Sequence, residues 1–323
     1  MFLKRNNLSL RKKTNSKKAS VVEKRPDIQR FHSKLRLFLG TGTNVHPKWG
    51  RFLPKNRWNV DQVPMPFSCV PGETYEEKGT DRIWIKQNQP AMQKRFCSLN
   101  FLFHPGKQQP NPTIIFRGKG KRISSLEQKS WDPRVHIKFQ EKAWCDRAFN
   151  KEWTNDVLLP AIKETAGPGE ESVLFCDNLD AQIQPEFLDQ LKSVDCFRNL
   201  FPTQSTEYVQ PVDAGCGRQV KVEVGKEFEE WLEDDDNLRL WEHGKLKEYE
   251  KRILITKFVG AAWEKICSRP DFSTDIYFQK TGCLLTLDGS EDHLINIEGM
   301  PDYKPVFIAV NDDEDGFPKP SKE

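Results

Sequence analysis

Two aspartates stand where their carboxylates could share a divalent cation. Asp177 follows residues 173–176, an apolar run typical of a strand buried on both faces. Its carboxylate would lie at the strand's C-terminal tip, where open α/β sheets place their ligands. Asp213 follows Pro211, which suits the first position of a helix, so Asp213 falls in that helix's first turn. Because Mg²⁺ prefers oxygen ligands, the pair predicts a metal site.

A third aspartate has a comparable setting. Asp61 ends the β-prone run of residues 58–61, and the strand breakers Pro64 and Pro66 follow it. A purely structural reason could explain any one of these acids, since a carboxylate in the first turn of a helix is stabilised by the helix dipole. The order and the flanking residues of all three favour one shared site.

The residues around these aspartates resemble the catalytic motifs of the DDE superfamily, specifically the pogo/Tigger-like branch of the Tc1/mariner transposases. The matching segments are Asn59-Val60-Asp61-Gln62, Leu174-Phe175-Cys176-Asp177-Asn178, Pro202-Thr203-Gln204-Ser205-Thr206 and Gln210-Pro211-Val212-Asp213. The 35 residues between Asp177 and Asp213 also resemble the family's spacing. Two positions depart from the pattern: Gln62 stands where the family commonly has Glu, and residues 179–182 replace a segment that often ends in His.

The resemblance implies an α/β fold, a ribonuclease-H-like mixed sheet flanked by helices. It also implies a DDE-type transposase that hydrolyses phosphodiester bonds at transposon ends and transfers the freed strand to target DNA. The catalytic residues would be Asp61, Asp177 and Asp213, which would hold two Mg²⁺ or Mn²⁺ ions. Two metal ions about 3.5–4 Å apart stabilise the attacking and the leaving oxygen of such a displacement.

Three further residues of these motifs would support the site. Asn178 would orient a carboxylate by hydrogen bonding, and Gln210 belongs to the third motif. Lys221 matches a lysine that the family often has after its third acid and could meet a phosphate, although an exposed helical lysine is an equally good reading. The implied partner is double-stranded DNA, both transposon terminal inverted repeats and target, in the nucleus; a homodimer stays open.

The main alternative is a catalytically inactive, domesticated or decayed transposase-derived protein that still binds DNA. Gln62 favours this alternative, whereas three intact aspartates favour the active enzyme. A general nuclease of the same fold, which would cut without regard to end sequence, is a weaker third option.

The net charge of +3 is too small to indicate nucleic-acid binding by itself, but basic residues gather near the N-terminus. Candidate DNA-binding residues are Lys4, Arg5, Arg11, Lys12, Lys13, Lys17 and Lys18. Such a block neutralises phosphates, although a basic tail or a nuclear-import signal has the same composition. Residues 1–14 resemble the last helix of a centromere-protein-B-type helix-turn-helix, which implies that the upstream helices are missing from this chain.

Cysteine spacing and hydropathy argue against zinc-binding, disulfide-rich, secreted and membrane-spanning proteins. The eight cysteines are scattered without a Cys-x-x-Cys pair, which supports neither a zinc site nor a disulfide scaffold and predicts reduced thiols. We find no signal peptide and no apolar run approaching about 18 residues, so we expect no membrane contact.

Periodicity predicts the elements that must position the acids. Strands are expected at residues 82–85, 95–103, 113–116 and 135–139, and the first three of these would form an antiparallel meander with the Asp61 strand. Helices are expected at residues 28–38, 142–162, 185–191 and 238–268, the last as one helix or a pair, with Trp144 and Trp153 as packing anchors of the second. Residues 117–122 form a basic turn, either simply solvated or in contact with DNA backbone, and 227–236 a solvated acidic patch.

These elements suggest five parts. They are a helix-turn-helix remnant (1–25), a helix and linker (26–54), the catalytic domain (55–235), a C-terminal helical part (236–310) and a disordered tail (311–323).

Overall fold

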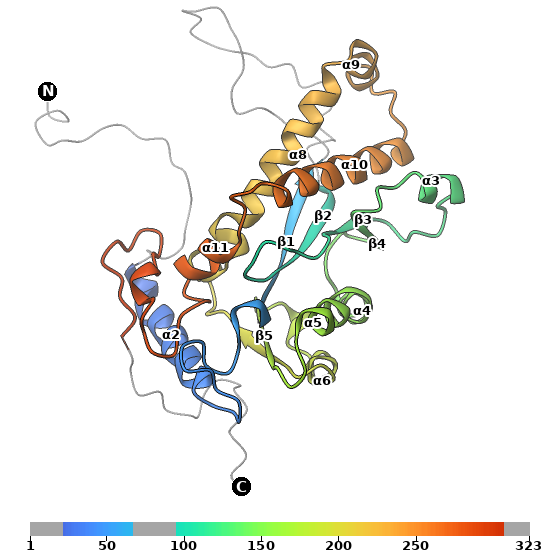
Figure 1. The fold of residues 1–323 in the computed structure, drawn as a ribbon. Helices are drawn as coiled ribbons and strands as arrows, with labels where there is room; N and C mark the ends of the chain where they lie inside the picture. The colour runs from blue at the N-terminus through green and yellow to red at the C-terminus, as the bar shows by residue number, and fades with distance from the viewer. Residues whose placement is uncertain (1–21, 67–94, 307–323) are drawn as a thin grey trace, which may run out of the picture.

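The computed structural model describes residues 22–66 and 95–306, which fold around one mixed sheet (Figure 1). The strand order is β4-β3-β2-β1-β5-β6, and β2 alone runs antiparallel to its neighbours. The strands are β1 (Arg57–Pro66), β2 (Arg95–Phe103), β3 (Thr113–Arg117), β4 (His136–Gln140), β5 (Ser172–Cys176) and β6 (Cys196–Leu200). The predicted α/β class and ribonuclease-H-like sheet are confirmed. The predicted meander is confirmed for β1, β2 and β3, whereas its strand at residues 82–85 lies outside the described residues.

Helices cover both faces of the sheet. In Figure 1, α8 and α10 run side by side over one face, and α4, α5 and α6 gather at the other. The first layer comprises α2 (Arg25–Leu39), α8 (Gly217–Leu232), α10 (Glu248–Cys267) and α11 (Asp275–Lys280), with α9 (Asp235–Glu242) next to α8. The second layer comprises α4 (Arg147–Trp153), α5 (Leu159–Thr165) and α6 (Pro185–Lys192); α3 (Ser125–Lys129) and α7 (Thr206–Val209) are short.

The alternation of β1 side chains decides which face the first acid meets. Val63 and Met65 pack in the core with α2, α8 and α10, whereas Trp58 and Val60 pack in the core with α4, α5 and α6. Because successive strand residues point to opposite faces, Asp61 shares the face of Val63. The acid therefore points toward the α8 layer.

The first strand is longer than predicted. We expected it to end at Asp61, but β1 continues through Pro64 to Pro66, pairing with β2. Its pairing with β5 stops at Asn59, and beyond that residue no other described strand pairs with this edge of β1. Proline is tolerated in a strand where its missing N–H faces no partner, which explains why Pro64 does not end the strand.

The helix predicted for residues 142–162 begins later and is not continuous. Asp146 caps its start by accepting a hydrogen bond from the Phe149 N–H at 2.8 Å, and a π-helical turn, Thr154–Leu158, separates α4 from α5. Trp153 is buried as predicted, and its indole N–H donates to the Thr113 hydroxyl at 2.9 Å. Trp144 lies before the helix and is 37% exposed, so its assignment as a packing anchor was wrong.

The predicted helix pair after residue 238 is present as α9 and α10, and the following segment completes the same core. Phe278, Leu285, Ile297 and Tyr303 are all buried there. The guanidinium of buried Arg57, at the start of β1, donates to backbone carbonyls of this segment at 3.2 and 2.8 Å. The C-terminal segment is therefore fastened to the strand that carries Asp61.

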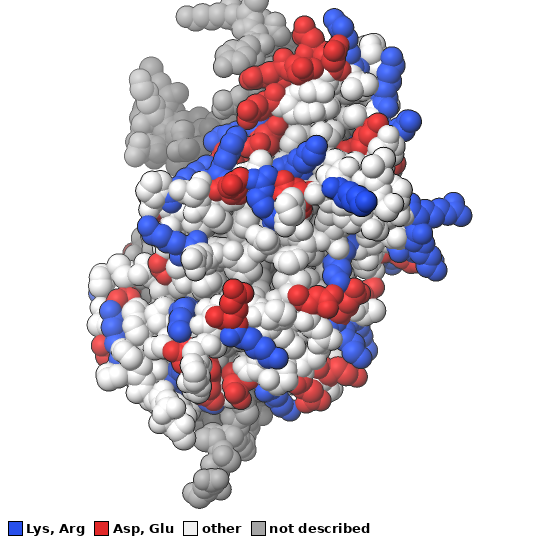
Figure 2. Space-filling model, turned by 45° about the vertical axis from the view of Figure 1, so that its right-hand side comes forward, with Lys and Arg blue, Asp and Glu red and all other residues white. Residues whose placement is uncertain are grey.

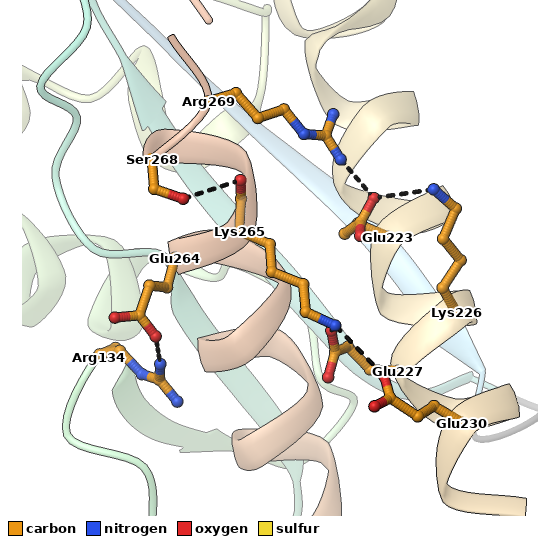
Figure 3. Close-up of polar contacts among 9 residues, drawn as sticks. All are labelled: Arg134, Glu223, Lys226, Glu227, Glu230, Glu264, Lys265, Ser268 and Arg269. Atoms are coloured by element: carbon orange, nitrogen blue, oxygen red, sulfur yellow. Dashed lines mark hydrogen bonds and ion pairs between the residues drawn. The ribbon is translucent and has the colours of Figure 1, made fainter. Parts of the chain in front are cut away.

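Ion pairs join α8 to α10, and they correct the prediction of a wholly solvated acidic patch (Figure 3). Glu227 lies 2.5 Å from the Lys265 ammonium and Glu230 lies 3.3 Å from it. Glu223 accepts a hydrogen bond from Arg269 at 2.6 Å. Exposed acids do crowd the top of the molecule in Figure 2, over the end of α8 and the start of α9.

Several predictions lie outside the described residues. They concern strand 82–85, the tail 311–323 and the basic residues Lys4, Arg5, Arg11, Lys12, Lys13, Lys17 and Lys18. The five-part division of the chain stays a prediction. Within the described ranges the cysteines form no disulfide, and no helix there is both long and apolar enough to cross a membrane.

Candidate active site

The register between β1 and β5 sets two aspartates side by side. Asn59 pairs with Phe175 in the parallel ladder. Two residues beyond that pair stand Asp61, still within β1, and Asp177, just past the end of β5. Asp61 is half-buried within β1, and Asp177 is exposed directly after β5.

The third aspartate comes from the opposing helical layer. Asp213 lies in a π-helical turn, η6 (Val212–Cys216), that leads into α8. Within this turn Gly215 has a φ of 142°, and a Cβ there would lie 2.7 Å from the Tyr277 ring of α11. Lys280, also in α11, donates a hydrogen bond to the Ala214 carbonyl. The turn is kinked at Gly215 and is held from outside by α11.

The three carboxylates act on one another electrostatically. The pKa of Asp61 is raised to about 8, first by burial and then by the negative charges of Asp213 and Asp177, against hydrogen bonds from the Gln62 N–H and the Gln210 side chain. Desolvation by neighbouring atoms also raises the pKa of Asp213, and Asp177 adds to that shift. All three predicted acids therefore lie close enough together for the charge of one to raise the pKa of another.

The predicted supporting residues also lie here. The Asn178 N–H donates to the Asp177 carboxylate at 2.7 Å, and its side-chain amide donates to the Phe201 carbonyl at 2.8 Å. Desolvation lowers the pKa of Lys221, whereas the charges of Asp213 and Asp61 act in the opposite direction. An ammonium group therefore stands beside the acids, although the functional roles of these residues stay predictions.

The motif analysis missed two residues. Glu207, in α7, contributes a further negative charge that raises the pKa of Asp213. The Asn59 side chain contacts both neighbouring acid-bearing elements, through the Phe175 carbonyl and the Val212 N–H. Asn59 stood inside a quoted motif, but only its position relative to these backbone groups reveals its role; no sequence signal marks Glu207.

The structure explains one departure from the family pattern. Gln62 follows Asp61 in the strand and so points to the opposite face, where its carbonyl oxygen accepts a hydrogen bond from the Cys145 N–H at 3.2 Å. Cys145 belongs to the core with α4, α5 and α6. Glutamine in place of glutamate therefore removes no carboxylate from the acid group.

The donor chemistry of the site fits a hard divalent cation, since aspartate oxygens are the ligands that Mg²⁺ and Mn²⁺ prefer. Among the described residues, however, no three His, Cys, Asp or Glu side chains lie close enough together to enclose a metal ion. Asp61, Asp177 and Asp213 are the side chains that could hold such an ion.

Comparison with known proteins gives one family match. The model of the DDE superfamily endonucleases matches residues 104–270, more than half of the chain, including Asp177 and Asp213 and beginning after Asp61. No curated protein matches the chain.

Solved structures of Mos1 complexes show remote similarity. The Mos1 strand transfer complex has 10% identity and a TM-score of 0.40, covering 81% of this chain and 66% of the Mos1 chain. The Mos1 paired-end complex with the left transposon end has 10% identity and a TM-score of 0.36, covering 81% and 67%. The chain thus spans about two thirds of the length of these Mos1 chains.

Proposed function

Because the chain belongs to the DDE superfamily of endonucleases, we propose that it is a metal-dependent transposase that cleaves DNA at transposon ends and joins the freed 3′ end to target DNA. One observation carries the proposal: three aspartates from β1, the end of β5 and the turn before α8 share one electrostatic environment. Crowded carboxylates are unfavourable without a cation, because the charge of each one opposes ionisation of its neighbours.

The residues that would hold Mg²⁺ or Mn²⁺ are Asp61, Asp177 and Asp213. When bound, the metal supplies charge stabilisation and an activated nucleophile for phosphodiester displacement. Asp61 must give up its proton to become a ligand, because burial and its neighbours raise its pKa to about 8. The Gln62 N–H donates to Asp61 at 2.7 Å and fixes its carboxylate.

The surrounding groups suit a phosphate-bearing substrate. The Lys221 ammonium, opposite Asp213 and Asp61, offsets part of their repulsion and is available to a phosphate oxygen. Asn178 links the ends of β5 and β6, so that Asp177 keeps a fixed place at the sheet edge. Double-stranded DNA is the proposed substrate, in the nucleus, and the motif words favour the pogo/Tigger-like branch.

The proposal is tested by nicking of supercoiled DNA carrying transposon ends, with Mg²⁺ or Mn²⁺ and with chelator. Wild type is expected to nick only with metal, and Asp177→Asn is expected to lose activity. The matched control is Asp180→Asn, an exposed aspartate three residues away that pairs with Arg147 at 2.7 Å. Nicking that persists in Asp177→Asn would contradict the proposal.

Two other outcomes separate the remaining functions. Folded wild-type protein that binds DNA but never nicks it would favour the non-catalytic, transposase-derived alternative. Metal-dependent nicking without preference for end sequences would favour a general nuclease of the same fold.

A further inference from the structure

We propose that Asn59 is the positioning residue that fixes the three acid-bearing elements relative to one another. Its side chain is fully buried in β1, on the same face as Asp61 and two residues before it. The inference rests on the proposed function, because it concerns the geometry of the same acidic site.

The Asn59 amide makes one hydrogen bond to each neighbouring element. Its Nδ2 donates to the Phe175 carbonyl of β5 at 3.1 Å, and its Oδ1 accepts from the Val212 N–H at 3.1 Å. Both partners are backbone groups with fixed roles, so the orientation of the amide is unambiguous. One planar side chain therefore spans the gap between a strand and the start of a helical turn.

Each contact lies one or two residues from an acid. Phe175 precedes Asp177 by two residues, and Val212 immediately precedes Asp213. A shift of either element against β1 would break one of these two hydrogen bonds. Asn59 therefore ties β5 and the turn with Asp213 to β1, close to all three acids.

The contact with Val212 also acts as a helix cap from another element. The first N–H groups of a helix have no partner within it, and Pro211, at the cap position, provides no side-chain hydrogen bond. The Asn59 side chain accepts the hydrogen bond of the Val212 N–H, one residue before Asp213. A leucine of similar size would leave this N–H and the Phe175 carbonyl buried without that partner, which is unfavourable.

Asn59→Leu and the milder Asn59→Ser test the proposal, with Asn56→Leu as the matched control. Asn56 is also fully buried and lies three residues earlier, but its amide donates to Glu170 at 2.9 Å, at the opposite end of β5. Mn²⁺ affinity, metal-dependent nicking and hydrogen exchange at the Val212 amide are measured on each folded protein.

Loss of an outer partner of a metal site typically costs about 10- to 100-fold in affinity or activity, so we expect that loss in Asn59→Leu and a smaller one in Asn59→Ser. Exchange at Val212 should accelerate roughly tenfold in both. Asn56→Leu should retain wild-type Mn²⁺ affinity, nicking and Val212 exchange, even if its overall stability falls.

The proposal is overturned if folded Asn59→Leu binds Mn²⁺ and nicks DNA like wild type. It is also overturned if Asn56→Leu loses both as severely, because a general effect on packing would then suffice. If wild type neither binds Mn²⁺ nor nicks DNA, the proposed function fails, and exchange at Val212 decides the positioning role: acceleration in Asn59→Ser supports it, and unchanged exchange refutes it.

Discussion

The acids on the sheet and the acid on the helical layer are held in different ways. Asp61 and Asp177 owe their neighbouring positions to the ladder between β1 and β5, with each carboxylate accepting a hydrogen bond from the next N–H along the chain. Asp213 lies in a π-helical turn whose place depends on Asn59 and on α11. The sheet side is positioned by regular pairing, and the helical side by single contacts distant in sequence.

This difference indicates where the site can be disturbed. A ladder distributes its hydrogen bonds over several residues, so one substitution leaves most of it intact. The turn with Asp213 depends on a few contacts with residues 275–306, a segment that is itself fastened to α2 and β1. We therefore expect the helical side to be the more sensitive to pH and to mutation.

Acidification should weaken the helical side through His32 of α2. Its Nε2 donates to the Thr281 carbonyl at 3.0 Å, and in the neutral imidazole its Nδ1 accepts from the Tyr303 hydroxyl at 2.7 Å. Burial lowers the pKa of His32 to about 4. Between pH 6.5 and 4 the unfolded chain binds a proton here that the folded protein does not, so stability falls as the pH falls through this window.

The free energy of unfolding should fall by about 3 kcal/mol at pH 4 because of His32. Above pH 6.5 His32 should cause no such loss. Denaturant unfolding across pH 4–7.5 measures it as the difference between wild type and His32→Gln. Glutamine can keep one donor and one acceptor without titrating, so its curve should be flatter. Parallel curves would show that His32 does not link pH to stability.

A smaller effect is expected at the turn itself, in Gly215→Ala. The new methyl group would meet the Tyr277 ring at 2.7 Å and would also strain a backbone with φ of 142°. We expect a loss of about 1–3 kcal/mol and reduced nicking. Gly118→Ala is the control, because its φ is 130° and, apart from its chain neighbours, no described residue has an atom within 4 Å of the added Cβ. Equal losses of stability and nicking in the two variants would show that contact with Tyr277 is not the cause.

The smallest effect is expected on the sheet side, in Gln62→Glu, which restores the family's usual residue. Either side chain can accept the Cys145 N–H, and it points away from Asp61. Nicking rates should match those of wild type under the same metal concentration. A clear gain of activity would mean that this position acts on the acids, contrary to its placement on the opposite face.

The same comparison explains what could be predicted from the sequence. Residues 173–176 and 58–61 carry local strand signals, so the place of Asp177 after one strand and of Asp61 within another followed from the local pattern. The length of β1 did not, because proline tolerance depends on where β5 stops pairing. Trp144 was misassigned because the Asp146 cap starts the helix after it.

The surroundings of Asp213 were the least predictable. Its position near the start of a helix followed from Pro211, but the π-helical turn, the glycine kink and the contacts with Tyr277 and Lys280 depend on a segment more than 60 residues later. Such tertiary contacts leave no periodic signal. The motif resemblance supplied Asp213 itself, and the structure supplied what holds it.

The most direct measurement is a double-mutant cycle on Mn²⁺ affinity with Asp61→Asn, Asp213→Asn and the double variant. If an acid from the sheet and an acid from the helical layer ligate one site, each single substitution should weaken binding strongly. The double variant should then bind no more weakly than the worse single variant. Losses that add independently, or Asp213→Asn with wild-type affinity, would contradict a shared site.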